Sequence, residues 1–345
     1  MNAVAVRLLH VEAAADAGPL ERGLAAVRAA MAERLADQFR QAGAADVAVR
    51  SGPPDDTPFG RRVRDLVARE QPAGIVIAGS GALALARAAD LAAFLATAAA
   101  DRRVALANNR YSADVVGIAC AAALRDVPDL RGDNALPRWL EESAGYVVRD
   151  LRSRRRLQVD VDGPLDARLA GVAWPEPRDT DAVDARIARL AKVGADRAAE
   201  VVVAGRTSAG TVRWLEEHLA ARVRALVEER GLRASGAGNR RPPRSVLGLL
   251  LERDGPGALG DVLAELGDAA LVDSRVLLAH RLGPDERSWP ALEDRLASDL
   301  LLADAVSDPW LRSLTASAAG ARIPVLLGGH TLVGPGLPLV FGAPR

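Results

Sequence analysis

Short apolar runs alternate with helical patterns along most of the chain, and this alternation constrains the fold more than any other feature. An apolar run over residues 73–79 precedes a helical pattern over 86–100. Residues 2–11 and 19–42 show the same order near the start of the chain. Strands that alternate with helices of this length are typical of a mostly parallel sheet with helices on both faces. We therefore predict an α/β fold.

The alternation breaks at residues 172–181, a segment rich in proline and acidic residues, and then restarts. Such a break is typical of a boundary between domains, and a chain of 345 residues suits two domains. We predict one α/β domain over residues 1–174 and a second, smaller Rossmann-like α/β domain over residues 175–345. For the second domain we expect strands over 199–205, 246–253 and 270–283, and a strand with a glycine-rich end over 322–336. We expect helices over 211–231, 257–267 and 291–319, and a loop over 232–245.

Composition excludes several classes of function. No apolar run reaches the roughly 18–20 residues that span a bilayer, and the first residues lack the pattern of a signal peptide. Basic and acidic residues balance at 45 each, so no strong attraction to nucleic acid or anionic lipid is expected. A single cysteine, Cys120, excludes an internal disulfide and a multi-cysteine metal site. We expect a cytoplasmic protein with no nucleic-acid or membrane partner, and the sequence leaves a homodimer open.

A glycine turn, Gly79-Ser80-Gly81, follows the apolar run over 73–79. Because the first N–H groups of a helix bind anions, these residues are candidate ligands for the phosphates of a nucleotide. The turn lacks the third glycine and the later acidic residue of a dinucleotide-binding fingerprint. The alternative is that the glycines only permit a sharp corner between strand and helix.

A second polar segment follows the next predicted strand and contains Asn108, Asn109 and Asp114. Open α/β sheets bind ligands at the carboxyl ends of their strands, so these side chains are also candidates for nucleotide binding. A structural loop that uses asparagine in left-handed conformations explains the segment equally well.

The order of these segments, followed by Asp160-Val161-Asp162-Gly163-Pro164-Leu165-Asp166, resembles the GT-A-like nucleotidyltransferases. This family includes the molybdenum-cofactor guanylyl- and cytidylyltransferases and the F420-pathway guanylyltransferase. The resemblance covers residues 1–170 and implies a GT-A-type sheet, a nucleotide and a phosphorylated small molecule as ligands, and Mg²⁺ held by Asp160 and Asp162. Residues two apart on a strand share a face, as this metal site requires. Alternatively, Asp162 caps a helix that starts near Pro164.

The chain also departs from the pattern of that family. Ser80 stands where the family has an aspartate, and residues 8–23 lack the glycine-rich loop that holds the nucleotide's phosphates. A hydroxyl is a poor replacement for a carboxylate as a ligand of Mg²⁺. Two functions remain open: a nucleotidyltransferase-like protein, active or catalytically degenerate, and a non-catalytic protein that binds a nucleotide or metabolite or assists assembly.

In the second domain, Arg206, Thr207 and Ser208 follow the predicted strand over 199–205. An arginine and two hydroxyls at a helix start suit a phosphate or carboxylate, although serine and threonine there are often only helix caps. His280 and His330 are candidate acids or bases in a polar cleft. The charged residues that would complete this cleft, or would instead form surface or interdomain ion pairs, are Asp273, Arg275, Asp294, Arg295 and Asp299.

Overall fold

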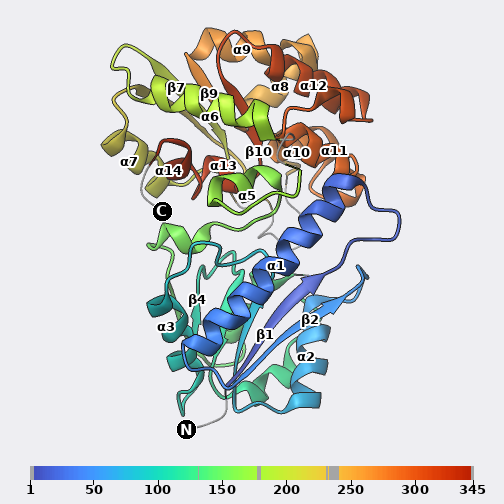
Figure 1. Cartoon of the computed structure of the whole chain (residues 1–345), viewed down its shortest axis with the longest axis vertical. Coiled ribbons are helices and arrows are strands. Elements are labelled where there is room, and N and C mark those ends of the chain that lie inside the picture. The colour runs from blue at the N-terminus through green and yellow to red at the C-terminus, as the bar shows by residue number, and fades with distance from the viewer. Residues whose placement is uncertain (1–3, 131, 177–179, 231, 233–240, 343–345) are drawn as a thin grey trace. The chain divides into compact units, whose positions relative to one another are not determined.

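The computed structural model describes residues 4–130, 132–176, 180–230, 232 and 241–342. The chain divides into two compact units (Figure 1). Unit 1 comprises Met1–Asp16 and Ala25–Val161, and unit 2 comprises Ala17–Leu24 and Asp162–Arg345. The predicted boundary after residue 174 falls within unit 2.

Unit 1 contains a mixed six-stranded sheet with the strand order β2-β1-β3-β5-β4-β6. Its strands are β1 (Val4–Val11), β2 (Asp46–Gly52), β3 (Gly74–Gly79), β4 (Val104–Ala107), β5 (Val115–Ile118) and β6 (Val147–Asp150). Strand β5 runs antiparallel to both β3 and β4, while the other pairings are parallel. The predicted mostly parallel sheet is therefore a mixed sheet. The connection from β4 to β5, residues 108–114, is too short for a parallel crossover, which requires a dozen or more residues.

Helices cover both faces of this sheet, as its two-residue periodicity requires. Residues of β1 and β3 alternate between two cores. One core joins the two strands to helices α1 (Pro19–Gln41) and α3 (Ala88–Ala98), through Val6, Leu8, Val76, Leu35, Phe39 and Phe94. The other joins them to α2 (Phe59–Glu70) and α4 (Leu136–Glu142), through Ala5, Ile75, Ile77, Leu66 and Leu140.

Unit 2 contains a smaller sheet of four parallel strands in the order β10-β9-β7-β8. The strands are β7 (Glu200–Gly205), β8 (Arg222–Val227), β9 (Ala269–Asp273) and β10 (Val325–Gly328). The helices are α5 (Pro164–Ala170), α6 (Asp181–Gly194), α7 (Ala209–His218), α8 (Val246–Asp254), α9 (Leu259–Leu266), α10 (Ser274–Leu282), α11 (Leu292–Asp299), α12 (Pro309–Gly320), α13 (His330–Val333) and α14 (Leu337–Val340). The α/β class predicted for the second half is confirmed.

Three element predictions in unit 2 are wrong. The predicted helix over 211–231 ends at His218 and is followed by strand β8, which pairs with β7 along its length. The predicted strand over 246–253 is helix α8, capped by Ser245. The predicted strand over 270–283 stops at Asp273, whose side chain caps helix α10. Short apolar runs fit a strand or a buried helix equally well, and the capping residues decide here for the helix.

The predicted helix over 291–319 is also interrupted, between α11 and α12. The carboxylate of Asp294 accepts hydrogen bonds from the N–H groups of Ser307 and Asp308, both at 2.8 Å. Asp294 therefore holds this turn and is not part of a polar cleft. The predicted loop over 232–245 and the predicted linker over 172–181 lie partly outside the described residues, at 233–240 and 177–179.

Residues 17–24, which include the first turns of α1, group with unit 2 although they stand early in the chain. The carboxylate of Glu293 accepts hydrogen bonds from the N–H groups of Leu20 and Glu21, at 3.0 and 2.9 Å. The Glu293 N–H donates in return to the Glu21 carboxylate at 2.9 Å. This reciprocal pair satisfies the first amides of two helices at once, since neither set has a partner within its own helix.

Candidate functional site

The carboxyl ends of β1, β3 and β4 lie along one edge of the unit 1 sheet, and several predicted ligands gather there. Gly79 ends β3, and its N–H donates to the carbonyl of Asp114 at 3.0 Å. The N–H of Ser80 donates to the carbonyl of Leu9 at 2.9 Å. Both amides are therefore used inside the protein, and neither is available to a ligand at this edge.

Asn108 and Asp114 form a closed network across the hairpin between β4 and β5. The Asn108 amide, which is 1% exposed, donates to the Asp114 carboxylate at 2.8 Å and to the carbonyl of Leu157 at 3.0 Å. Its oxygen accepts from the Asp114 N–H at 3.0 Å. Asn109 accepts a hydrogen bond from the N–H of Tyr111, also at 3.0 Å. Neither Asn108 nor Asn109 has the left-handed conformation that the structural alternative expected. Their side chains serve the loop through hydrogen bonds instead.

His10 belongs to this edge, although the sequence prediction missed it. Its Nδ1 lies 3.2 Å from the hydroxyl of Ser80, and both side chains are buried. Burial lowers the pKa of His10, and the nearby Arg28 guanidinium lowers it further. The imidazole is therefore neutral at pH 7 and can exchange a proton with Ser80 or with a ligand. The one available signal was a polar residue near the end of an apolar strand.

The tight approach at Gly81 comes from the protein's own chain. A Cβ at this position would lie 2.8 Å from both the Asp160 carboxylate and the Val161 carbonyl. The Val161 N–H donates to the Gly81 carbonyl at 3.1 Å, and Arg28 Nε donates to the Val161 carbonyl at 2.7 Å. Residues 160–161 therefore leave no room for a side chain at position 81, and this explains the glycine.

The glycine turn does not sit at a helix N-terminus, which corrects the basis of its predicted phosphate contact. Turns occupy residues 80–85, and α3 begins only at Ala88. The wholly buried Asp90 belongs to the capping box at the N-terminus of α3, where its carboxylate accepts a hydrogen bond from the Arg87 N–H at 2.9 Å. The same carboxylate forms ion pairs with Arg154 and Arg156. Burial opposes ionisation of Asp90, but these hydrogen bonds outweigh it and lower its pKa.

The predicted metal ligands do not lie on one strand, because residues 159–163 form no strand. Asp160 belongs to unit 1 and Asp162 to unit 2. Gly163, not Asp162, is the N-cap of α5, so the predicted cap is wrong as well. The Asp162 N–H donates to the Asp166 carboxylate at 3.1 Å.

Among the described residues, no three His, Cys, Asp or Glu side chains are grouped so that they could hold a metal ion. Mg²⁺ is often held by only one or two protein carboxylates together with substrate phosphates. Asp160, beside Gly81, is therefore the candidate magnesium ligand of unit 1, and the metal stays a prediction.

Four predicted residues gather at the carboxyl edge of the unit 2 sheet. Arg206, Thr207 and Ser208 follow β7, and His330 follows β10. The Arg206 guanidinium forms a bidentate pair with the buried carboxylate of Asp273 at the end of β9, at 2.6 and 3.0 Å. Burial opposes the charge of Asp273, but Arg206 outweighs it and lowers the pKa of this carboxyl group. Arg206 therefore holds two strand ends together.

Gly205 allows this close contact between the ends of β7 and β9. Its φ is +129°, and a Cβ there would lie 2.3 Å from the Cβ of Asp273. Ser208 caps α7 by accepting from the Thr211 N–H at 3.1 Å, as its alternative interpretation predicts. His330 Nδ1 lies 3.1 Å from the Arg206 carbonyl. Because a carbonyl only accepts, Nδ1 carries the proton of this ring.

His280 does not join His330 at this edge. It lies near the end of α10, where its Nδ1 accepts from the Ser245 N–H at 3.1 Å and its Nε2 is 3.0 Å from the Glu252 carboxylate. The ring stands against Gly248 of α8. His280 therefore positions α8 against α10.

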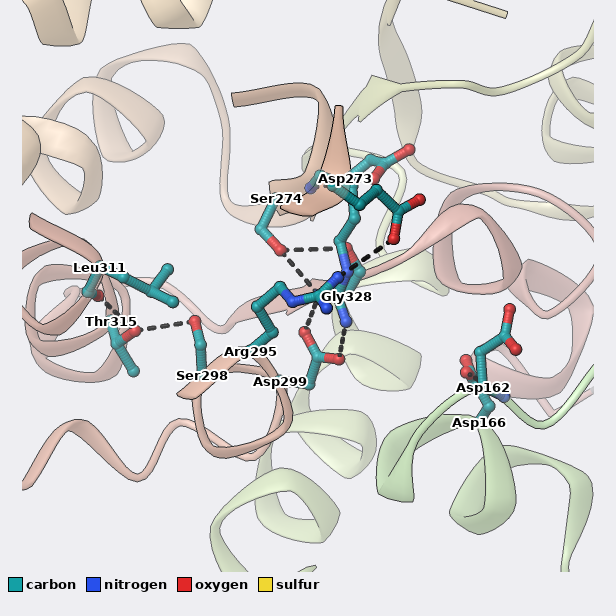
Figure 2. Close-up of polar contacts among 12 residues, drawn as sticks. Asp162, Asp166, Asp273, Ser274, Arg295, Ser298, Asp299, Leu311, Thr315 and Gly328 are labelled. Carbon is teal, nitrogen blue, oxygen red and sulfur yellow. Dashed lines mark hydrogen bonds and ion pairs between the residues drawn. The ribbon is translucent and has the colours of Figure 1, made fainter. Parts of the chain in front are cut away.

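A second buried ion pair, Arg275–Asp299, lies beside the first, because the Arg275 N–H donates to the Asp273 carboxylate at 3.2 Å. Figure 2 labels the two carboxylates, Asp273 and Asp299. Arg275 donates from both terminal nitrogens to Asp299, at 2.6 Å from Nη2, and also to Ser274 at 2.9 Å. Although burial opposes its charge, Asp299 raises the pKa of Arg275. Figure 2 shows the Arg295 side chain reaching the same cluster. The sequence prediction of surface or interdomain pairs is wrong for Arg275 and Asp299, which are buried within unit 2.

None of the described helices combines the length and the hydropathy that a membrane crossing requires. Comparison with known families found no family model that matches the chain, and comparison with curated proteins found no match either.

Proposed function

We propose that unit 1 is a nucleotide-binding module of GT-A nucleotidyltransferase type that does not transfer the nucleotidyl group. The observation that carries this proposal is the buried pair of His10 and Ser80 at the carboxyl ends of β1 and β3. Ligands of open α/β sheets bind at this edge. The identity of the ligand as a nucleotide is inferred from the resemblance over residues 1–170. The same resemblance implies a phosphorylated small molecule as a second ligand, and we propose that the protein acts in the cytoplasm.

The loss of transfer chemistry follows from Ser80. Nucleotidyl transfer needs Mg²⁺ on hard carboxylate ligands, and the residue at this position is a hydroxyl that contacts a neutral imidazole. Asp160 is the remaining carboxylate beside the turn. A single carboxylate can support binding of a magnesium–nucleotide complex, but it leaves the metal without the second protein anchor.

Calorimetric titration of the full chain with GTP, CTP and ATP, with and without Mg²⁺, tests binding. A bound nucleotide at 100 times its dissociation constant raises the free energy of unfolding by about 2.7 kcal/mol, which a thermal shift detects. Ser80→Ala should weaken that binding, because it removes the hydroxyl that contacts His10 at the edge proposed to bind the ligand. Ser143→Ala, at an exposed position beyond α4, is the matched control and should leave affinity unchanged.

An assay of magnesium-dependent pyrophosphate release separates binding from transfer. We expect no release with any nucleoside triphosphate. Release by the wild type that Asp160→Asn abolishes would instead assign nucleotidyl transfer to unit 1. If none of the nucleotides binds, both nucleotide binding and nucleotidyl transfer by unit 1 are refuted.

A further inference from the structure

Tyr111 lies at the carboxyl edge of the unit 1 sheet, in the loop between β4 and β5. It is 49% exposed, whereas the other aromatic side chains of the described residues are buried or partly buried. Aromatic side chains stabilise a fold by burying a large apolar area, and an exposed ring forgoes that burial. An exposed ring on a loop at the ligand-binding edge of an α/β sheet is therefore a candidate contact for a ligand.

The loop that carries Tyr111 is cross-linked by its own hydrogen bonds. The Asn108 side chain bonds both the carboxylate and the N–H of Asp114, at 2.8 and 3.0 Å. The Tyr111 N–H donates to the side-chain oxygen of Asn109 at 3.0 Å. The ring therefore stands on an ordered backbone, and a ligand that contacts it does not have to order the loop first.

Two arginines flank the ring. The guanidinium carbon of Arg152, which follows β6, lies 5.2 Å from the centroid of the Tyr111 ring, and that of Arg110 lies 6.0 Å from it. Atoms in contact are about 3.5–4.0 Å apart, so neither guanidinium is stacked on the centre of the ring. The Arg152 side chain is itself 54% exposed. A flat ligand that stacks on Tyr111 can therefore also contact a guanidinium plane, which itself stacks on aromatic faces.

Both arginines have a carboxylate partner within unit 1. Arg152 Nε lies 2.8 Å from the Asp150 carboxylate, and Arg110 pairs with Glu141 of α4. These four groups together carry no net charge, so they lack the positive potential that attracts phosphate. An aromatic face flanked by neutralised guanidinium planes suits a flat, uncharged ring, and nucleobases are rings of this kind.

The position of this aromatic face fits a ligand that also reaches the His10–Ser80 pair. Strand β5 stands between β3, which ends just before Ser80, and β4, which leads into the Tyr111 loop. Neighbouring strands are about 4.8 Å apart, so the ends of β3 and β4 are about 10 Å apart. A nucleotide spans such a separation, because its base and its phosphates lie on opposite sides of the ribose.

We propose that Tyr111 is the base-binding residue of unit 1, and that the base of the bound nucleotide stacks on its ring beside Arg110 and Arg152. This inference rests on the nucleotide binding proposed above. It adds which part of the ligand each strand end contacts: the base lies at the end of β4, and the phosphates lie at the end of β3.

Calorimetric titration of the full chain with GTP and with ATP, in the presence of Mg²⁺, tests the stacking. Tyr111→Ala should lower the affinity at least about fivefold, because it removes the aromatic face. Tyr111→Phe keeps the ring and should bind as the wild type does. Because Tyr111 is exposed, both variants should fold, and thermal unfolding checks this. The matched control is Val147→Ala, at a 61% exposed position where β6 begins, which should leave the affinity unchanged.

Titration with tripolyphosphate, which has no base, separates a contact with the base from a contact with the phosphates. We expect Tyr111→Ala and the wild type to behave alike toward this ligand, because the stacking involves the base alone.

Three results would overturn the inference. The first is a Tyr111→Ala variant that binds GTP and ATP as tightly as the wild type, in which case nucleotide binding by unit 1 stands and only the stacking fails. The second is an equal loss of affinity in Tyr111→Phe, which would assign the contact to the hydroxyl. The third is an equal loss of affinity for tripolyphosphate, which would place the phosphates at Tyr111. If the wild type binds no nucleotide, the proposed function fails and this inference fails with it.

Discussion

The carboxyl group of Asp166 lies inside unit 2 and its nearest charged neighbours include two further acids. Burial raises its pKa well above the ordinary value of 3.8, and the negative charges of Asp162 and Asp299 raise it further. The folded state therefore keeps a proton on Asp166 that the unfolded chain releases. Folding stability must fall as the pH rises from 3.8 toward the higher pKa of the folded state.

Asp166→Asn removes this titration while it keeps an oxygen that can accept from the Asp162 N–H. We expect the variant to gain stability over the wild type above pH 3.8, by a margin that grows with pH and then levels off. Urea denaturation at a series of pH values measures the margin. Asp304→Asn, at an exposed position in the same unit, is the control and should show no such trend. Parallel stability curves for wild type and Asp166→Asn would contradict this account.

Because the Arg206–Asp273 ion pair is buried, we expect truncation of one partner to cause a large loss of folding stability. Asp273→Ala leaves the guanidinium of Arg206 buried without its counter-ion, which destabilises by about 3–5 kcal/mol. Chemical denaturation measures the loss. Asp254→Ala breaks the exposed pair with Arg253 and should leave stability unchanged. Equal effects of the two substitutions would show that the buried pair contributes no more than the exposed one.

Sequence analysis identified candidate residues that directly follow a strand. It missed residues whose role depends on contact with a residue far away in the sequence. Arg206, Thr207 and Ser208 were accessible because an apolar run precedes them. His10 was not, because its contact with Ser80 joins residues 70 positions apart. The buried Arg275–Asp299 pair was missed for the same reason, because the charge pattern left only a polar cleft or surface and interdomain pairs open and does not record burial.

Among whole elements, capping residues and connection lengths explain where the sequence prediction failed. Ser245 starts α8 as a helix, and the Asp273 side chain starts α10, although both segments have the apolar composition of a strand. Predictions based on long alternation, such as β1, β3 and α1, agree with the structure because tertiary contacts reinforce the local pattern there.

Two glycine-to-alanine substitutions in helices should have opposite signs. In Gly248→Ala the new Cβ would lie 2.5 Å from the His280 ring, so α8 and α10 must separate, at about 1–3 kcal/mol. At Gly320, in the last turn of α12, a Cβ meets nothing within 4 Å, so alanine should stabilise by about 0.4–1 kcal/mol. Urea denaturation of both variants checks the signs, and a gain in stability for Gly248→Ala would refute the contact.

For the whole molecule, the balance of charges has a consequence for solubility. With 45 basic and 45 acidic residues and a pI near 6.9, the chain carries almost no net charge at pH 7. Proteins without net charge associate more readily than charged ones. We expect solubility in ammonium sulfate to be lowest near neutral pH and to rise on both sides. A steady trend through pH 7 would contradict this expectation.

The division of the chain also limits how a gene of this kind can be cut and rejoined. A break between codons 161 and 162 would not release a whole second half, because unit 2 includes Ala17–Leu24. The cut would strip Glu293 of the two peptide N–H groups that it binds. A recombination event that exchanged only the second half of the gene would therefore transfer unit 2 without its residues Ala17–Leu24. We expect the two halves of the gene to be inherited together.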